Sequence, residues 1–250
     1  MDLSAFSLEG RTVLVTGANT GTGQGICVAA AKAGATVLGV GRSSLDETAT
    51  LVGDAFHPIT CDLADHASAL AMLGQAERRH GPLFGLVNNA GIIRRADSVD
   101  HSESDWDDVM DINLKAVFLL SQAFARTAIA EGRTAKIVNI ASLLSFQGGI
   151  RVAAYTASKH GVAGLTKVMA NEWAAKGINV NAIAPGYVES NNTEALRADP
   201  DRSTAILARI PAGRWGRPAD IGAATVFLLA PASDYMHGTI VPVDGGWLAR

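Results

Sequence analysis

Short runs of apolar, often β-branched residues alternate along the chain with longer amphipathic stretches. Seven such runs read as buried strands, at residues 12–16, 36–40, 56–61, 83–87, 136–140, 178–184 and 239–243. The intervening stretches predict helices over residues 26–33, 67–80, 105–130, 153–175 and 217–230. Because strands that alternate with helices favour parallel βαβ units, we expect an α/β fold with one doubly wound, seven-stranded parallel sheet and helices on both faces.

The domain organisation follows from the same pattern. No repeat, low-complexity tract or interdomain linker interrupts it, so residues 1–250 are interpreted as one domain. The polar stretch 187–209 is a long connection, which suggests a mobile lid over a site. Helices 105–130 and 153–175 carry apolar residues on more than one face, which predicts association through these helices.

Composition narrows the function classes. Hydrophobic residues make up 48% of the chain and charged residues only 18%, which indicates a sizeable core. A net charge of −3 without a basic run argues against nucleic acid or an anionic membrane surface as partner. Residues 1–10 lack a long apolar run, so we expect neither a secretory signal nor a membrane span, and a cytoplasmic location. Cys27 and Cys61 have no metal-ligand spacing and read as buried, inert thiols.

A glycine-rich turn follows the first strand directly. It reads Gly17-Ala-Asn-Thr-Gly21-Thr-Gly23-Gln-Gly25 and leads into an Ala-rich helix. Glycines let the backbone approach a pyrophosphate, and a helix N-terminus offers unpaired N–H groups to it. The bare spacing also suits a simple tight turn; its place between strand and helix favours a dinucleotide site.

The end of the second strand bears on cofactor choice. An acidic side chain there holds the ribose hydroxyls of NAD, whereas a basic one accommodates the 2′-phosphate of NADP. This chain has Arg42 at that point and no carboxylate before Asp46. The arginine favours NADP, although an exposed arginine in a solvated loop is an equally good interpretation.

Tyr155 and Lys159 are the first candidates for chemistry. They stand four residues apart on a predicted helix, so their side chains share a face. A neighbouring ammonium favours the phenolate and brings the tyrosine pKa toward the range that acid–base catalysis needs. Ser142, at the end of the preceding strand, could donate a hydrogen bond to a carbonyl oxygen that the tyrosine also holds. Taken alone, the pair also suits an ordinary helix surface.

Together these motifs resemble the short-chain dehydrogenase/reductase family, from Gly10 to the end of the chain. The motifs that carry the resemblance are Thr16-Gly17-x-x-x-Gly21-x-Gly23, Asp62-Leu63, Asn88-Asn-Ala-Gly91, Asn113, Ser142, Tyr155-x-x-x-Lys159 and Pro185-Gly186. The resemblance implies a Rossmann fold and an NAD(P)-dependent enzyme that acts on CH–OH groups without a metal.

The resemblance also implies a role for each matching residue. Tyr155 would be the acid/base, Ser142 would orient the substrate oxygen, and Lys159 would bind the nicotinamide ribose and lower the tyrosine pKa. Asn113 would hold a water in a proton relay, although it also suits a buried hydrogen-bonding role without a catalytic part. The expected cofactor-binding residues are Gly17, Asn19, Thr20, Gly21, Thr22, Gly23, Arg42, Asp62, Leu63, Asn89, Ala90, Gly91, Tyr155, Lys159, Pro185, Gly186, Val188 and Ser190. Ser190 stands where the family often has threonine.

Further stretches resemble the family's sugar-acid dehydrogenases. They include Gly91-Ile-Ile-Arg-Arg95, Ile210-Pro-Ala-Gly-Arg-Trp-Gly216 and Asp244-Gly-Gly-Trp-Leu-Ala-Arg250. This implies a homotetramer that passes a hydride between NAD and the C5 position of a six-carbon keto-sugar acid. The substrate carboxylate would need an arginine; Arg94, Arg95 and Arg151 are the candidates, and we expect Arg94 to bind it, with Gln147 binding a substrate hydroxyl. Each of these arginines also suits a solvated surface. A 3-oxoacyl-thioester reductase and a non-catalytic dinucleotide-binding domain are the alternatives.

Overall fold

A seven-stranded parallel sheet forms the centre of the molecule in the computed structural model, which describes residues 3–250. The strand order is β3-β2-β1-β4-β5-β6-β7, so the chain winds outward from β1 in one direction and then from β4 in the other. The strands are β1 Thr12–Thr16, β2 Thr36–Gly41, β3 Phe56–Thr60, β4 Gly85–Asn88, β5 Ala135–Ile140, β6 Ile178–Pro185 and β7 Ile240–Val243. The expected single-domain, doubly wound α/β fold is confirmed; Met1 and Asp2, which the domain prediction included, lie outside the described residues.

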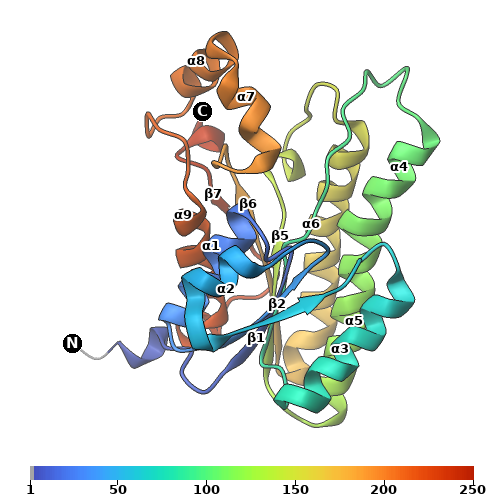
Figure 1. The fold of residues 1–250 in the computed structure, drawn as a ribbon, viewed down its shortest axis with the longest axis vertical. Helices are drawn as coiled ribbons and strands as arrows, with labels where there is room; N and C mark the ends of the chain where they lie inside the picture. The colour runs from blue at the N-terminus through green and yellow to red at the C-terminus, as the bar shows by residue number, and fades with distance from the viewer. Residues whose placement is uncertain (1–2) are drawn as a thin grey trace.

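Helices cover both faces of the sheet (Figure 1). Alternate strand residues point to opposite faces, so Val13 and Val15 pack with one set of helices and Leu14 with the other. One layer contains α1 Gly21–Lys32, α2 Asp46–Val52 and α9 Pro218–Leu229. The other contains α3 His66–His80, α5 Ala116–Ala130 and α6 Ala153–Trp173. Cys27 and Cys61 are buried, as predicted, and burial raises the pKa of Cys27 to about 12.

Three helical features differ from the sequence prediction. Helix α1 begins at Gly21 rather than at residue 26, because the glycine turn itself forms its first turn. Helix α2 was not predicted, since its polar sequence lacks an apolar stripe. The predicted helix 105–130 is interrupted: α4 Glu103–Met110 and α5 are joined by a π-helical turn at Asp111–Lys115.

The expected lid, residues 187–209, contains two short helices, α7 Glu194–Ala198 and α8 Pro200–Arg209. The Asp199 carboxylate caps α8 by accepting hydrogen bonds from the backbone N–H groups of Asp201 and Arg202, both at 3.1 Å. Both helices rise beyond the sheet, beside the C-terminus of the chain (Figure 1). The mobility of this segment stays a prediction.

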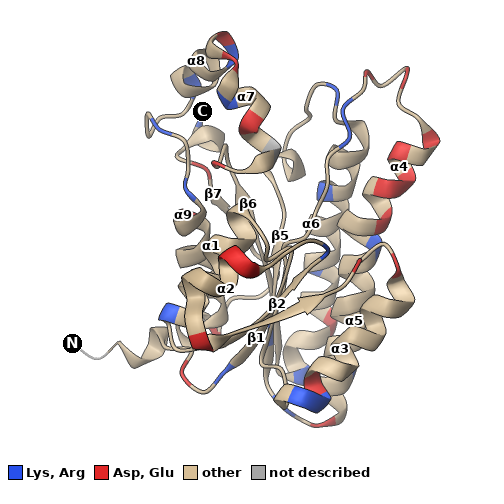
Figure 2. Ribbon diagram, viewed as in Figure 1, with Lys and Arg blue, Asp and Glu red and all other residues tan. Residues whose placement is uncertain are grey.

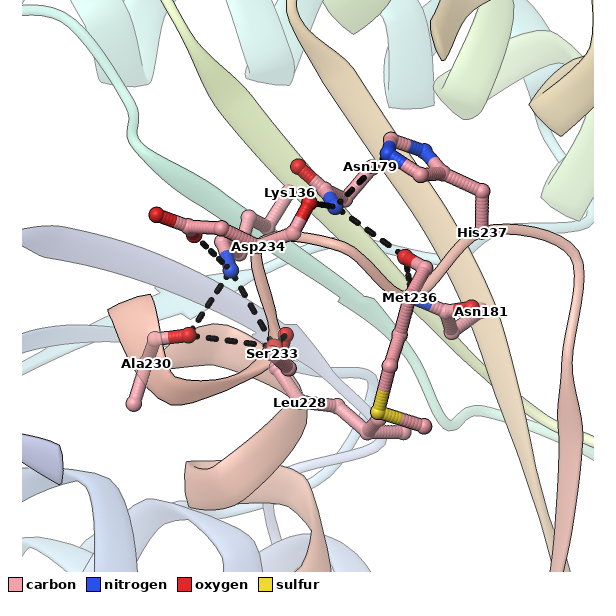
Figure 3. A network of polar contacts seen from close by, with 9 residues as sticks. All are labelled: Lys136, Asn179, Asn181, Leu228, Ala230, Ser233, Asp234, Met236 and His237. Carbon is pink, nitrogen blue, oxygen red and sulfur yellow. Dashed lines mark hydrogen bonds and ion pairs between the residues drawn. The ribbon is translucent and has the colours of Figure 1, made fainter. Parts of the chain in front are cut away.

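A buried lysine fixes the loop that enters β7 (Figure 3). Lys136 on β5 is 4% exposed, and its Nζ lies 2.7 Å from the Asp234 carboxylate and donates to the Ala230 carbonyl at 2.7 Å. The amides of Asn179 and Asn181 on β6 donate to backbone carbonyls of the same loop. The last strand is thereby tied to the two strands before it in the sheet.

No helix within residues 3–250 is long and apolar enough to cross a membrane.

Candidate active site

Three candidate residues meet where β5 ends and α6 begins: Ser142 follows β5, and Tyr155 and Lys159 lie in the first two turns of α6. Lys159 Nζ donates a 2.6 Å hydrogen bond to the carbonyl of Ile140, the last residue of β5, and lies 5.6 Å from the centre of the Tyr155 ring. Ser145 donates to the Lys159 carbonyl at 2.7 Å, which also ties α6 to the segment after β5. Ser142, Tyr155 and Lys159 line one cavity.

Burial has the largest effect on the pKa values of Tyr155 and Lys159. It raises the pKa of the Tyr155 phenol, while a hydrogen bond from Ser142 and the charge of Arg95 lower it by less. Burial also lowers the pKa of Lys159 to about 8. The sequence led us to expect Lys159 as the charge that makes the tyrosine more acidic. The structure instead gives a raised tyrosine pKa, and the charge that opposes burial belongs to Arg95.

Ser142 is prepared to donate a hydrogen bond. Its Oγ accepts from the backbone N–H of Leu144 at 3.2 Å, and its interaction with Tyr155 lowers the pKa of the phenol. The serine, like Tyr155, lines both this cavity and the neighbouring one.

Asn113 is fully buried in the π-helical turn. Its amide accepts from the N–H of Ile92 at 2.8 Å and donates to the carbonyl of the same residue at 2.9 Å. It also donates to Ser158 at 3.3 Å, and Ser158 donates to the Tyr155 carbonyl at 2.8 Å. The side chain therefore joins the loop after β4 to the start of α6; the expected role in holding a water stays a prediction.

The glycine turn and the end of β4 enclose the other side of this cavity, which measures about 350 Å³. Gly17 has a φ of 64°, and a Cβ on Gly23 would lie 1.9 Å from the Gly17 carbonyl oxygen. The Asn89 amide donates to the carbonyls of Thr16 and Gly17 at 2.9 and 3.0 Å. A Cβ on Gly17 or Gly23 would collide with the neighbouring backbone and with Asn89, so glycine at these two positions keeps the backbone of the turn accessible to a phosphate group.

A second opening of about 170 Å³ continues the cavity beyond Gly17 to the end of β2. It is lined by Arg42, whose guanidinium lies 3.8 Å from the Asp62 carboxylate, and by Leu63. Both groups are largely exposed, so the pair leaves the arginine able to meet a ligand. Every residue expected to bind the cofactor lines one of these two cavities, which also include Ile140, Ala141, Asn191 and Thr193.

A third cavity, of about 480 Å³, adjoins Tyr155 and Ser142 on the side of the lid. The candidates Gln147 and Arg151 line it, and Arg151 Nε also lies 3.3 Å from Asp97. Arg95, which the sequence offered beside Arg94, lines it as well, as do Arg202 and Arg209, which sequence reasoning missed. Nothing in their local sequence distinguishes them from surface arginines, because the fold alone brings the loop after β4 and helix α8 together.

The structure does not support the expectation that Arg94 binds the substrate carboxylate. This side chain does not line the third cavity; its Nε lies 3.2 Å from Asp105 and its NH2 atom 3.0 Å from Asp108. Figure 2 shows acidic residues gathered on α4, where these carboxylates lie. The acidic sequence of α4 was a signal that the nearest arginine would be held there, leaving Arg95 to face the cavity.

Comparisons with known proteins agree with this arrangement. A family model described as short chain dehydrogenase matches residues 11–201. The chain is 55% identical over 253 residues to a 2-dehydro-3-deoxy-D-gluconate 5-dehydrogenase of Escherichia coli, covering 100% of both chains. A solved structure from Agrobacterium tumefaciens with bound NADP, provisionally assigned as a 2-deoxy-D-gluconate 3-dehydrogenase, is 62% identical with a TM-score of 0.94, covering 98% of this chain and 99% of that one.

A gluconate 5-dehydrogenase from Burkholderia cenocepacia, solved in complex with NADP and tartrate, is 39% identical with a TM-score of 0.93. The alignment covers 99% of each chain. The family model spans well over half of this sequence, and the relatives match its full length. The chain belongs to the short-chain dehydrogenase family.

Proposed function

We propose that the protein is a 2-dehydro-3-deoxy-D-gluconate 5-dehydrogenase, which interconverts an alcohol and a ketone at C5 of that sugar acid. As a member of its family it is an NAD(P)-dependent oxidoreductase that acts on CH–OH groups. One observation carries the choice of substrate: Tyr155 and Ser142 line both the glycine-turn cavity and an adjoining cavity lined by four arginines and no carboxylate. The named relatives support the same substrate.

The residues present fit a bound dinucleotide. The open cradle at Gly17 and Gly23 suits the pyrophosphate, and the opening lined by Arg42 and Asp62 suits the adenosine. Lys159, Gly186 and Ser190 line the opposite end, where the nicotinamide ribose would be held. When bound, the cofactor accepts or supplies the hydride.

The chain's own groups handle the proton and the substrate oxygen. In the oxidative direction, Tyr155 takes the proton from the substrate hydroxyl, and in reduction it returns a proton to the carbonyl oxygen. Ser142 donates a hydrogen bond to the same oxygen and stabilises negative charge that develops on it. The hydrogen bond from Ser142 and the positive charge of Arg95 favour the phenolate, although burial has the larger effect and raises the pKa of Tyr155.

The sequence resemblance and the structure favour different cofactors. The sequence resemblance implied NAD, whereas the solved structures of the relatives from Agrobacterium tumefaciens and Burkholderia cenocepacia hold NADP. Arg42 at the end of β2 favours NADP, because it lines the cavity where a 2′-phosphate would lie. Other sugar acids, such as gluconate oxidised at C5 or 2-deoxy-gluconate oxidised at C3, place a carboxylate in the same cavity and are the alternative substrates.

Assembly and cellular role belong to the same proposal. An apolar groove between α5 and α6 is lined by Met110, Leu114, Phe118, Gly161 and Leu165, and Phe118 is 38% exposed. Such a surface supports the predicted association into a homotetramer. The proposed reaction places the enzyme in the breakdown of pectin and uronates in the cytoplasm.

Absorbance at the nicotinamide band tests the function. The purified protein is assayed with 2-dehydro-3-deoxy-D-gluconate, D-gluconate, 2-deoxy-D-gluconate and a 3-oxoacyl thioester, each with both cofactors. We expect the highest kcat/KM on the first compound. A higher value on the thioester contradicts the sugar-acid assignment, and the absence of turnover on every compound contradicts the enzyme assignment.

A further inference from the structure

Helix α8 presents two arginines to the substrate cavity. Arg202 and Arg209 are seven residues apart, about two helical turns, so both lie on one face of the helix. Both line the cavity, and neither forms an ion pair with a residue in the described part of the chain. Arg94, Arg133 and Arg214, by contrast, are each paired with carboxylates. The positive charge of the α8 arginines is therefore left for a ligand.

The base of α8 is fixed rather than free. Ile206 and Ile210 pack with Trp247 and Leu248 of the C-terminal segment, and Arg250 donates to the Ala208 carbonyl at 2.9 Å. The Arg209 guanidinium lies 4.0 Å from the centre of the Trp247 ring, a stacked geometry that holds it in one orientation. Trp247 is 4% exposed and lines the cavity, and its indole N–H finds no acceptor among residues 3–250.

Of the four arginines around the cavity, Arg151 is paired with Asp97, and the other three lie at two different ends. Arg95 lies near enough to Tyr155 for its charge to lower the tyrosine pKa, which places it at the reacting end. Arg202 and Arg209 belong to the lid and to the surroundings of Trp247. In a six-carbon acid that reacts at C5, the carboxylate carbon is four bonds from the reacting carbon, about 5 Å in an extended chain with bonds of about 1.5 Å. The carboxylate therefore lies away from Tyr155.

We propose that Arg202 and Arg209 bind the substrate carboxylate and so determine the enzyme's specificity for acids. This inference rests on the proposed function. Arg95, at the other end, acts on the ionisation of Tyr155.

The test compares Arg202→Gln and Arg209→Gln with the wild-type protein. Initial rates are measured on 2-dehydro-3-deoxy-D-gluconate and on its neutral carboxamide. Because a hydrogen bond to a charged group contributes about 1.5–3 kcal/mol, each variant should raise KM for the acid about tenfold or more. The KM for the carboxamide should change less than about twofold in the same variants, because the neutral amide forms no ion pair with either arginine.

Controls separate specificity from folding. Arg79→Gln removes an exposed arginine on α3, outside the substrate cavity, and should leave both KM values unchanged. Arg209→Lys keeps the charge and should recover part of the affinity for the acid. Quenching or enhancement of NADPH fluorescence shows that each variant still binds cofactor, because its site lies in other cavities.

Each outcome decides one claim. Equal losses on acid and carboxamide, or no loss on either, overturn the assignment of the α8 arginines. Stronger competitive inhibition of the wild-type protein by inorganic phosphate than by D-gluconate would show a phosphate site and also overturn it. A wild-type protein that turns over no keto-sugar acid contradicts the proposed function itself, independently of the variants.

Discussion

Lys159 Nζ lies 5.6 Å from the centre of the Tyr155 ring and is bonded to the Ile140 carbonyl at the end of β5. The two groups are held together in a buried place, and burial acts on them in opposite directions. It raises the pKa of the phenol and lowers that of the ammonium to about 8. Each group therefore stays closer to its neutral form than it would in water.

The lowered pKa of Lys159 predicts a pH-dependent stability. The folded protein releases this proton above about pH 8, whereas the unfolded chain keeps it up to 10.5. The unfolded state binds more protons between these values, so the free energy of unfolding rises with pH through that window. Urea denaturation of the cofactor-free protein should show a rise of about 2 kcal/mol between about pH 8 and 10, relative to Lys159→Met. Parallel pH profiles for the two proteins would refute this account.

The glycine turn should not tolerate a methyl group at Gly23. A Cβ there would lie 1.9 Å from the Gly17 carbonyl oxygen, so the turn must open and the phosphate cradle is lost. Gly23→Ala should weaken cofactor binding at least about a hundredfold, by fluorescence titration, or prevent folding. Gly164→Ala is the matched control, because nothing lies within 4 Å of its Cβ in α6 and alanine stabilises a helix by about 0.5–1 kcal/mol. Equal cofactor affinity in both variants would contradict the cradle.

Arg42 should determine the affinity for NADP. Arg42→Asp replaces the cation at the end of β2 with a carboxylate that repels a 2′-phosphate and accepts ribose hydroxyls. The Kd for NADP should rise about tenfold or more, while that for NAD stays equal or falls. The stability cost should be small, because the ion pair with Asp62 is long and exposed. Arg79→Asp serves as control, and equal changes for both cofactors would exclude a phosphate-binding role.

The buried Lys136 should make Asp234 important for stability. Asp234→Ala leaves the 4% exposed ammonium without its only carboxylate partner among the described residues. Asp234 is itself 68% exposed and Lys136 keeps its hydrogen bonds to Ala230 and Ser233, so Asp234→Ala should lower the free energy of unfolding by about 1–2 kcal/mol. The double variant Lys136→Met/Asp234→Ala should recover part of that loss in urea denaturation. The single variant Lys136→Met completes the comparison. If the double variant loses as much free energy of unfolding as the two single variants together, the two residues do not interact.

The sequence predicted most of the fold because the information was local. β1 was predicted to the residue, since Thr12–Thr16 is a β-branched run that ends at a glycine turn. The π-helical turn around Asn113 could not be predicted, because it depends on the amide bonding Ile92, which lies on the loop after β4. Tertiary contact, not local propensity, decides that geometry.

The sequence likewise predicted one part of the candidate site, the cofactor residues, but not the other, the substrate arginines. The cofactor residues follow from fixed positions in the strand–turn–helix corner and from a family resemblance, and they line connected cavities. The substrate arginines do not follow from sequence. Arg94 and Arg95 are adjacent, and only the acidic face of α4 decides which of them is withdrawn from the cavity. Arg202 and Arg209 reach the site because α8 packs on Trp247, a contact between distant segments.

The most direct test of the proposed chemistry is Tyr155→Phe, assayed by nicotinamide absorbance with 2-dehydro-3-deoxy-D-gluconate, beside a fluorescence titration of the cofactor. Tyr235→Phe is the matched control, because Tyr235 is 101% exposed. If Tyr155 transfers the proton, kcat falls at least about a thousandfold in Tyr155→Phe while the Kd for the cofactor changes less than about threefold. Turnover within about tenfold of the wild-type rate would contradict the role of Tyr155 as acid and base.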